Sequence, residues 1–223
     1  MLPLSRRNDV GIIAGVNPFE TILDFIDRGG FVMWPLILMS ILTLSVVIER
    51  ASFWIQLDSK RGRRRFDRLA DAVRSGRKDR LSGFLEEDPS PYAELARNLP
   101  IDQGPIDDTE AALAAESIRP RLERGLLLLS TIVTAAPMLG ILGTVVGIIQ
   151  SFELLGGDAT ITDPSQVSGG IAEALISTAT GLVVALVALF PYMLFSNRQD
   201  RAIGRLEVLG GLLIAASRRR GDS

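Results

Sequence analysis

Three long apolar runs without a single charge constrain this chain more than any other feature. The runs cover residues 29–48, 125–152 and 174–197, and strongly charged segments separate them. A helix needs about 20 apolar residues to cross the hydrocarbon core of a bilayer, which is about 30 Å thick. A soluble domain would instead spread its apolar residues periodically along amphipathic elements. The sequence therefore predicts an all-α membrane protein with three transmembrane helices.

The composition excludes several kinds of functional site. The chain has no Cys and no His, which removes disulfides, thiol nucleophiles, Cys/His zinc sites, haem ligation by His and imidazole-based triads. Its 24 basic and 26 acidic residues nearly cancel, so the overall charge gives no support to nucleic-acid binding. We expect neither an enzyme nor a bound cofactor or metal.

Basic residues are distributed unevenly around the three runs, and this predicts the orientation. Residues 50–80 carry eleven Lys and Arg and the tail from Arg198 carries six, whereas 1–30 carry three and 154–168 none. Lys and Arg near the ends of spans stay in the cytoplasm. We therefore expect a periplasmic N-terminus and a cytoplasmic C-terminus. The basic runs are typical of a solvated face, and the same charges could also bind anionic membrane lipids.

The apolar and polar patterns divide the chain into seven segments. Within the polar region before the second span, breaks at Gly and Pro predict short helices, and a new helix is expected near Asp107, bent at Pro120. The third span is expected to continue inward as a helical stalk. The segments are a periplasmic N-terminus with an interfacial amphipathic helix over 18–28 (1–28), transmembrane helix 1 (29–55), a cytoplasmic helical region (56–124), transmembrane helix 2 (125–153), a periplasmic loop (154–168), transmembrane helix 3 (169–196) and a cytoplasmic helical tail (197–223).

Small residues recur at helical spacing in the second and third spans. In the second span Ala136, Gly140, Gly143 and Gly147 follow steps of four and three, and Thr144 lies beside them. The third span has a matching smooth stripe with Ala174, Thr178 and Gly181, and a polar stripe beside it with Glu173, Ser177 and Thr180. In lipid, such faces let two helices approach closely. Helix packing alone explains why glycines recur on these faces.

Glu173 and Pro137 need a further explanation. A carboxylate within a span is costly, so Glu173 is a functional candidate, although its place near the outer end also lets it reach the headgroups. Pro137 leaves the carbonyl of Val133 without its usual amide donor, which indicates a kink or a local polar contact.

The strings at 136–152 and 170–182 resemble the MotA/TolQ/ExbB proton-channel family. The ExbB/TolQ branch is the closer one, because it has three spans in this orientation. Thr180 departs from the family, which often has an aliphatic residue there, and the cytoplasmic region does not align. The resemblance implies a bacterial inner-membrane homopentamer whose pore is lined by the second and third spans. It assigns an ion pathway to Thr144, Thr178 and Glu173, and helix packing or pore lining to Ala136, Pro137, Gly140, Gly143, Gly147, Ser177 and Gly181.

The same resemblance implies partners and a function. The pore would enclose an ExbD- or TolR-like single-span subunit, whose aspartate lies within a belt of Thr144 and Thr178 hydroxyls, and a TonB- or TolA-like energy transducer would receive the work. The hypothesis is a stator subunit driven by the proton-motive force. Two alternatives stay open: a passive scaffold without ion conduction, and a permease component. The lack of a second charge within the spans and of paired discontinuous helices disfavours the permease.

Overall fold

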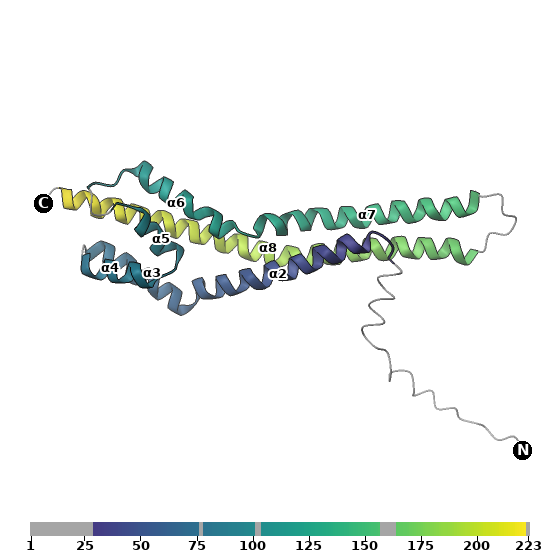
Figure 1. Cartoon of the computed structure of the whole chain (residues 1–223), viewed down its shortest axis with the longest axis horizontal. Helices are drawn as coiled ribbons and strands as arrows, with labels where there is room; N and C mark the ends of the chain where they lie inside the picture. The colour runs from purple at the N-terminus through teal and green to yellow at the C-terminus, as the bar shows by residue number, and fades with distance from the viewer. Residues whose placement is uncertain (1–28, 76–77, 101–103, 157–163, 222–223) are drawn as a thin grey trace, which may run out of the picture. The chain divides into compact units, whose positions relative to one another are not determined.

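The fold of the chain is known from a computed structural model, which describes residues 29–75, 78–100, 104–156 and 164–221. Within these ranges every regular element is an α-helix (Figure 1). Three of the helices are long and apolar enough to cross a membrane: α2 (Met33–Asp58), α7 (Leu126–Gly156) and α8 (Pro164–Gly221). The predicted all-α chain with three such helices is confirmed for the described residues. Its orientation and ring assembly stay predictions.

Three helix boundaries differ from those expected. The first span was predicted from residue 29, but α2 begins at Met33, because Gly30 has a left-handed φ of 68° that a helix cannot include. The outer loop predicted over 154–168 is shorter at both ends, since α7 continues to Gly156 and α8 begins at Pro164. Proline suits the first position of a helix, where its missing amide proton is not needed. The amphipathic helix predicted over 18–28 lies outside the described residues.

The third span and the tail form one uninterrupted helix. α8 has 58 residues, and at 1.5 Å per residue it is roughly 87 Å long. In its last third, Leu206, Leu209 and Leu213 are buried on one side, at the spacing expected for an apolar stripe. The expectation that the third helix continues as a stalk is confirmed.

Four shorter helices lie between α2 and α7. They are α3 (Lys60–Ser75), α4 (Lys78–Glu87), α5 (Pro91–Asn98) and α6 (Asp108–Glu123). Ser90 caps α5 by accepting a hydrogen bond from the amide of Ala93 at 3.3 Å. A capping box formed by Asp107 and Glu110 begins α6, where acidic residues predicted a helix start. Short helices in this region are confirmed, and Pro120 lies within α6.

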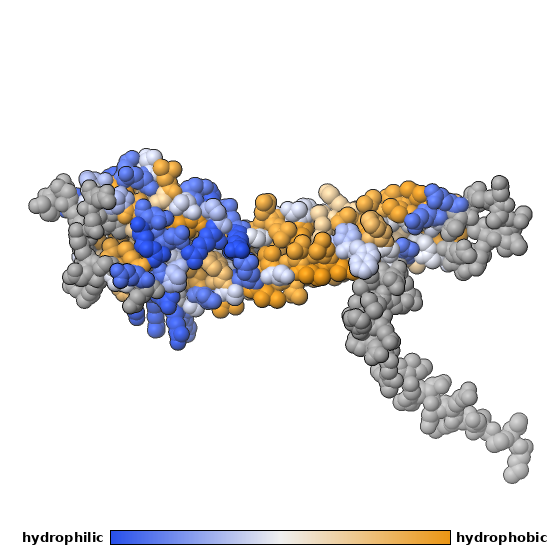
Figure 2. All heavy atoms as spheres, in the orientation of Figure 1, coloured by the Kyte–Doolittle hydropathy of each residue, from blue (hydrophilic) through white to orange (hydrophobic). Residues whose placement is uncertain are grey.

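The described residues belong to two compact units. Unit 1 comprises residues 29–40 and 134–185, and its core is the contact of α7 with α8. Unit 2 comprises residues 41–133 and 186–221. In unit 2, α5 packs on α6, and the amide of Ile106 donates to Ser217 Oγ of α8 at 2.9 Å. The surface of α3 to α6 is largely hydrophilic (Figure 2).

A buried arginine in unit 2 joins α2 to the end of α6. Arg50 is 3% exposed, and its Nη1 donates to the carbonyl of Arg121 at 3.0 Å. This carbonyl lies in the last turn of α6, where helix carbonyls lack an amide partner. The next helix follows Gly125, which has a φ of 77°, and a Cβ there would lie 2.7 Å from Val46 Cγ1. Gly125 and the guanidinium of Arg50 therefore fix the connection between α6 and α7.

Candidate functional site

The backbones of α7 and α8 touch in unit 1. A Cβ on Gly140 would lie 3.0 Å from Thr178 Cα, and a Cβ on Gly181 would lie 3.1 Å from Gly140 Cα. Nine in ten contacts of real Cβ atoms are longer than these distances, and both are made with backbone atoms, which cannot turn aside as a side chain can. Both glycines are buried, and so is Ala136, whose carbonyl oxygen faces Gly181. The smooth faces of the two helices therefore permit an approach that any larger residue at these positions would prevent.

The contact continues along α7 toward the far end of unit 1. A Cβ on Gly147 would lie 2.9 Å from Ala174 Cβ, and a Cβ on Gly143 would overlap the hydroxyl of Ser177. Ser177 is 1% exposed and donates to the carbonyl of Ala174 at 2.8 Å. Ser151 lies at this end of the contact: its hydroxyl donates to the carbonyl of Gly147 in its own helix at 2.8 Å and occupies the space that a Cβ of Gly170 in α8 would need. Every small residue of the α7 stripe is thus covered by α8.

One hydroxyl bridges the two helices directly. Thr178 Oγ1 of α8 donates to the carbonyl oxygen of Gly140 in α7 at 2.7 Å. The threonine side chain is partly buried, and its oxygen can still accept hydrogen bonds while its proton is engaged. In the described structure Thr178 therefore faces α7, with acceptor capacity to spare.

Thr144 makes a different contact. Its hydroxyl donates to the carbonyl of Ile141 in its own helix at 2.6 Å, and its side chain is partly exposed. It lies one turn after Gly140 and so flanks the contact with α8. The two threonines share the neighbourhood of Gly140, but no hydrogen bond joins them within the described ranges. Pro137, one turn before Ile141, is also partly exposed.

Glu173 lies against the segment that precedes α2. Its Oε1 occupies the space that a Cβ of Gly30 would need, and the carboxylate is partly buried. Gly30 has the left-handed φ of 68°, so its backbone also favours glycine. The sequence reasoning did not single out Gly30. The signal that could have found it is the pair Gly29 and Gly30 directly before an apolar run.

The described site offers hydroxyls, backbone carbonyls and one carboxylate. Such groups can accept, donate and relay hydrogen bonds in a place that water enters poorly. A search of the described residues for clusters of His, Cys, Asp and Glu that could hold a metal ion finds none. The chemistry that this arrangement supports is hydrogen-bond exchange between helices.

The geometry alone does not identify the family of the chain, but comparison with known proteins does. A model of the MotA/TolQ/ExbB proton channel family matches residues 86–208, which include all of α7 and the part of α8 that contacts it, residues 170–181. A protein of Synechocystis named putative biopolymer transport protein ExbB-like 3 is 36% identical over 184 residues, which are 76% of this chain and 80% of that protein. The Vibrio cholerae biopolymer transport protein exbB1 is 28% identical over 185 residues, which are 80% of each chain.

A further relative comes from the Tol-Pal branch. The Tol-Pal system protein TolQ of Pseudomonas aeruginosa is 44% identical over 87 residues, which are 38% of this chain and 36% of that protein. Both the extent of the family match and the identity to the Synechocystis protein support one conclusion. The chain is a multi-pass membrane protein that belongs to the MotA/TolQ/ExbB proton channel family, in its ExbB/TolQ branch.

Proposed function

We propose that the chain is an ExbB/TolQ-like stator subunit of the bacterial inner membrane. It assembles as a homopentamer around an ExbD- or TolR-like single-span partner. The assembly converts the proton-motive force into mechanical work on a TonB- or TolA-like energy transducer that spans the envelope. The N-terminus lies in the periplasm, and the C-terminal stalk lies in the cytoplasm.

The hydrogen bond between Thr178 and Gly140 carries this proposal. A protonated carboxyl of the partner can donate to Thr178 Oγ1 while the bond to the Gly140 carbonyl persists. A deprotonated carboxylate cannot donate, so the hydroxyl must turn its own proton toward it and release the carbonyl. Protonation of the partner would thereby tighten or loosen the contact of α7 with α8, and Thr144 offers a second hydroxyl on the next turn of α7.

The free energy that one proton releases on crossing the membrane is comparable to the free energy of one hydrogen bond between the helices. One elementary charge that crosses about 100 mV releases about 2.3 kcal/mol. A side-chain hydrogen bond between helices in a membrane contributes about 0.6 to 2 kcal/mol. The passage of one proton can therefore exchange one such bond, and repeated passage can bias a rearrangement of packed helices.

The proposal also requires a second polypeptide. The uncharged runs 125–152 and 174–197 hold no acid, and Glu173 lies just before the second of them. A proton-driven device needs a group that binds and releases a proton within the membrane. The partner's aspartate would supply this group, and Glu173 would take part at the edge of the pathway.

The experiment measures proton flux in vesicles. The full chain is reconstituted with a single-span, aspartate-bearing protein encoded beside its gene, and internal pH is followed after a gradient is imposed. Thr178→Val and Thr144→Val should each lower the flux at least about tenfold without loss of assembly. Thr180→Val is the matched control, because its hydroxyl only returns to the carbonyl of Ile176 in its own helix, at 2.8 Å.

Two results would overturn the proposal. Flux that is equal in all three variants would mean that the threonines carry no proton pathway. An assembly that forms but conducts no protons, and whose conformation ignores an uncoupler, would instead favour the passive scaffold.

A further inference from the structure

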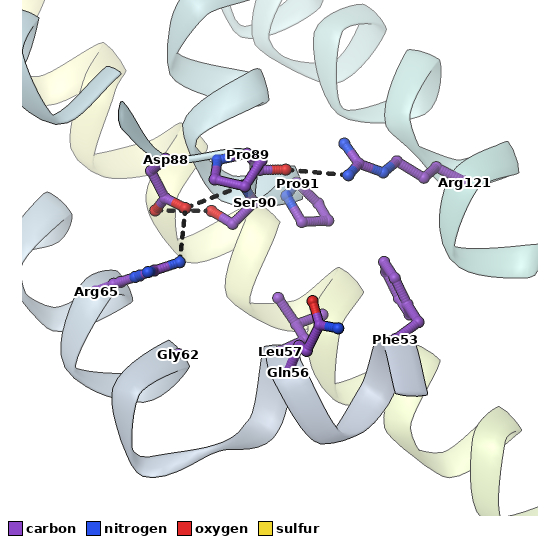
Figure 3. A pocket seen from close by; sticks show the side chains of 10 residues that line it. All are labelled: Phe53, Gln56, Leu57, Gly62, Arg65, Asp88, Pro89, Ser90, Pro91 and Arg121. Atoms are coloured by element: carbon purple, nitrogen blue, oxygen red, sulfur yellow. Dashed lines mark hydrogen bonds and ion pairs between the residues drawn. The ribbon is translucent and has the colours of Figure 1, made fainter. Parts of the chain in front are cut away.

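Unit 2 contains a cavity that the proposed proton pathway does not use. It has a volume of about 220 Å³ and lies between the end of α2, the start of α3 and the turn that precedes α5 (Figure 3). Arg65 borders it on one side and Arg121 on the other. Phe53 and Leu57 of α2 and Pro91 of α5 supply an apolar wall.

Arg65 has donors to spare. Its side chain is 55% exposed, and its Nη1 forms an ion pair with Asp88 Oδ1 at 3.8 Å, a distance too long for a hydrogen bond. The Asp88 carboxylate accepts two hydrogen bonds from Ser90, whose amide and hydroxyl each donate at 3.0 Å. The Arg65 guanidinium donates no hydrogen bond within the described part of the chain. Its fork of N–H groups is thus available to an anion in the cavity.

Arg121 contributes charge and holds the rim in place. Its Nη1 donates to Glu94 Oε2 at 2.6 Å, and its Nη2 donates to the carbonyl of Pro89 at 3.0 Å. These bonds fix the turn that closes the cavity. The carboxamide of Gln56 projects from α2 toward the same space (Figure 3), and it adds an uncharged donor.

The position of the cavity along the helices is that of lipid headgroups. Phe53 follows the end of the first uncharged run, residue 48, by five residues, and Arg121 precedes the start of the second run by four. At 1.5 Å per residue these offsets are about 6 to 8 Å. The headgroup layer extends about 5 to 8 Å beyond the hydrocarbon on each side. Gln56 and Leu57 lie three and four residues farther from the hydrocarbon than Phe53, so the cavity begins in the headgroup layer and extends away from the bilayer core.

The surrounding charge favours an anion. Residues 58–68, which connect α2 to α3 and form the start of α3, carry six basic and two acidic side chains. Most of these basic side chains are exposed. A ligand with an anionic head group and an apolar body would match the basic side and the apolar wall of the cavity.

We propose that this cavity binds the headgroup of an anionic phospholipid, with Arg65 and Gln56 donating to its phosphate. The glycerol and the first acyl carbons lie against Phe53, the apolar wall residue nearest the hydrocarbon. A bound lipid would thus touch both the end of the first span and, through Arg121, the helix that leads to the second. The site would tie the short helices of unit 2 to the membrane surface.

The test is native mass spectrometry of the full chain in a neutral detergent, titrated with phosphatidylglycerol. Arg65→Gln should weaken binding at least about tenfold, because it removes the charged donors of the cavity that make no hydrogen bond within the described structure. Arg64→Gln is the matched control, since it removes the same charge from the next position of α3, outside the cavity. It should change binding less than about threefold, because a neutral micelle has no anionic surface to attract it.

A second variant leaves the charge unchanged. Gln56→Phe fills the cavity from an exposed position of α2 and should also weaken binding at least about tenfold, with helix content checked by circular dichroism. Equal effects of Arg64→Gln and Arg65→Gln would overturn the proposal, and so would equal binding of phosphatidylcholine. Full competition by soluble glycerol phosphate would show a site for a free phosphate ester instead of a lipid. None of these outcomes depends on proton flux.

Discussion

Gly181 is the position where a single added methyl group tests the packing of α7 on α8 most sharply. A Cβ at this residue would overlap the carbonyl oxygen of Ala136 and lie 3.1 Å from Gly140 Cα and 3.2 Å from Gly140 N. All three atoms belong to the backbone of α7, so no flexible side chain can move aside. Gly181→Ala must therefore push the two helices apart.

Gly204 provides the matched control in the same helix. A Cβ on Gly204 meets nothing within 4 Å, so Gly204→Ala should gain about 1 kcal/mol from helix propensity. Gly181→Ala has the same gain but loses about 1–3 kcal/mol through overpacking and about 0.6–2 kcal/mol if the bond from Thr178 to Gly140 breaks. The free energy of unfolding of Gly181→Ala should be about 2–5 kcal/mol below that of Gly204→Ala.

The assay is unfolding of the detergent-solubilised chain by increasing fractions of sodium dodecyl sulfate, followed by circular dichroism. Gly211→Ala is a second control, since a Cβ there also meets nothing within 4 Å. If Gly181→Ala proved as stable as the two controls, α7 and α8 would not touch in the way described.

Three further predictions concern unit 2. Gly125→Ala should lower the free energy of unfolding by about 1–2 kcal/mol, the cost of a left-handed backbone in a residue with a side chain, as measured by chemical denaturation. Asp107→Ala should cost about 1 kcal/mol in the same assay, because α6 loses its capping box. Burial raises the pKa of Tyr92 above its usual value of about 10, although the nearby charge of Arg205 acts against this. The contribution of Tyr92 to the free energy of unfolding should therefore be fully present below pH 10 and be lost as the pH rises through the raised pKa, whereas Tyr92→Phe should lose less stability over that range in alkaline denaturation.

The sequence predicted those parts of the fold that depend on local composition. Charge-free runs of sufficient length identify helices that can cross a membrane, and the acidic residues near Asp107 indicate the start of α6. The spacing of Gly140, Gly143 and Gly147 identifies a smooth face on α7, and α8 covers these three residues in the structure.

Features that depend on contacts between distant segments could not be predicted in this way. No local pattern indicates that Gly30 leaves room for Glu173, or that Arg50 is buried against the last turn of α6. The loop after α7 was overestimated, because its polar composition does not show that Pro164 can begin a helix. The sequence also does not indicate to which acceptor the hydroxyl of Thr178 donates its hydrogen bond.

The most direct test of the proton-driven mechanism is a solved structure of the chain assembled with its single-span partner. We expect the α7 and α8 faces that bear Thr144 and Thr178 to enclose the partner's helix, with its aspartate within hydrogen-bond distance of one of these hydroxyls. An assembly in which both threonines face acyl chains, with no second polypeptide beside them, would contradict the mechanism.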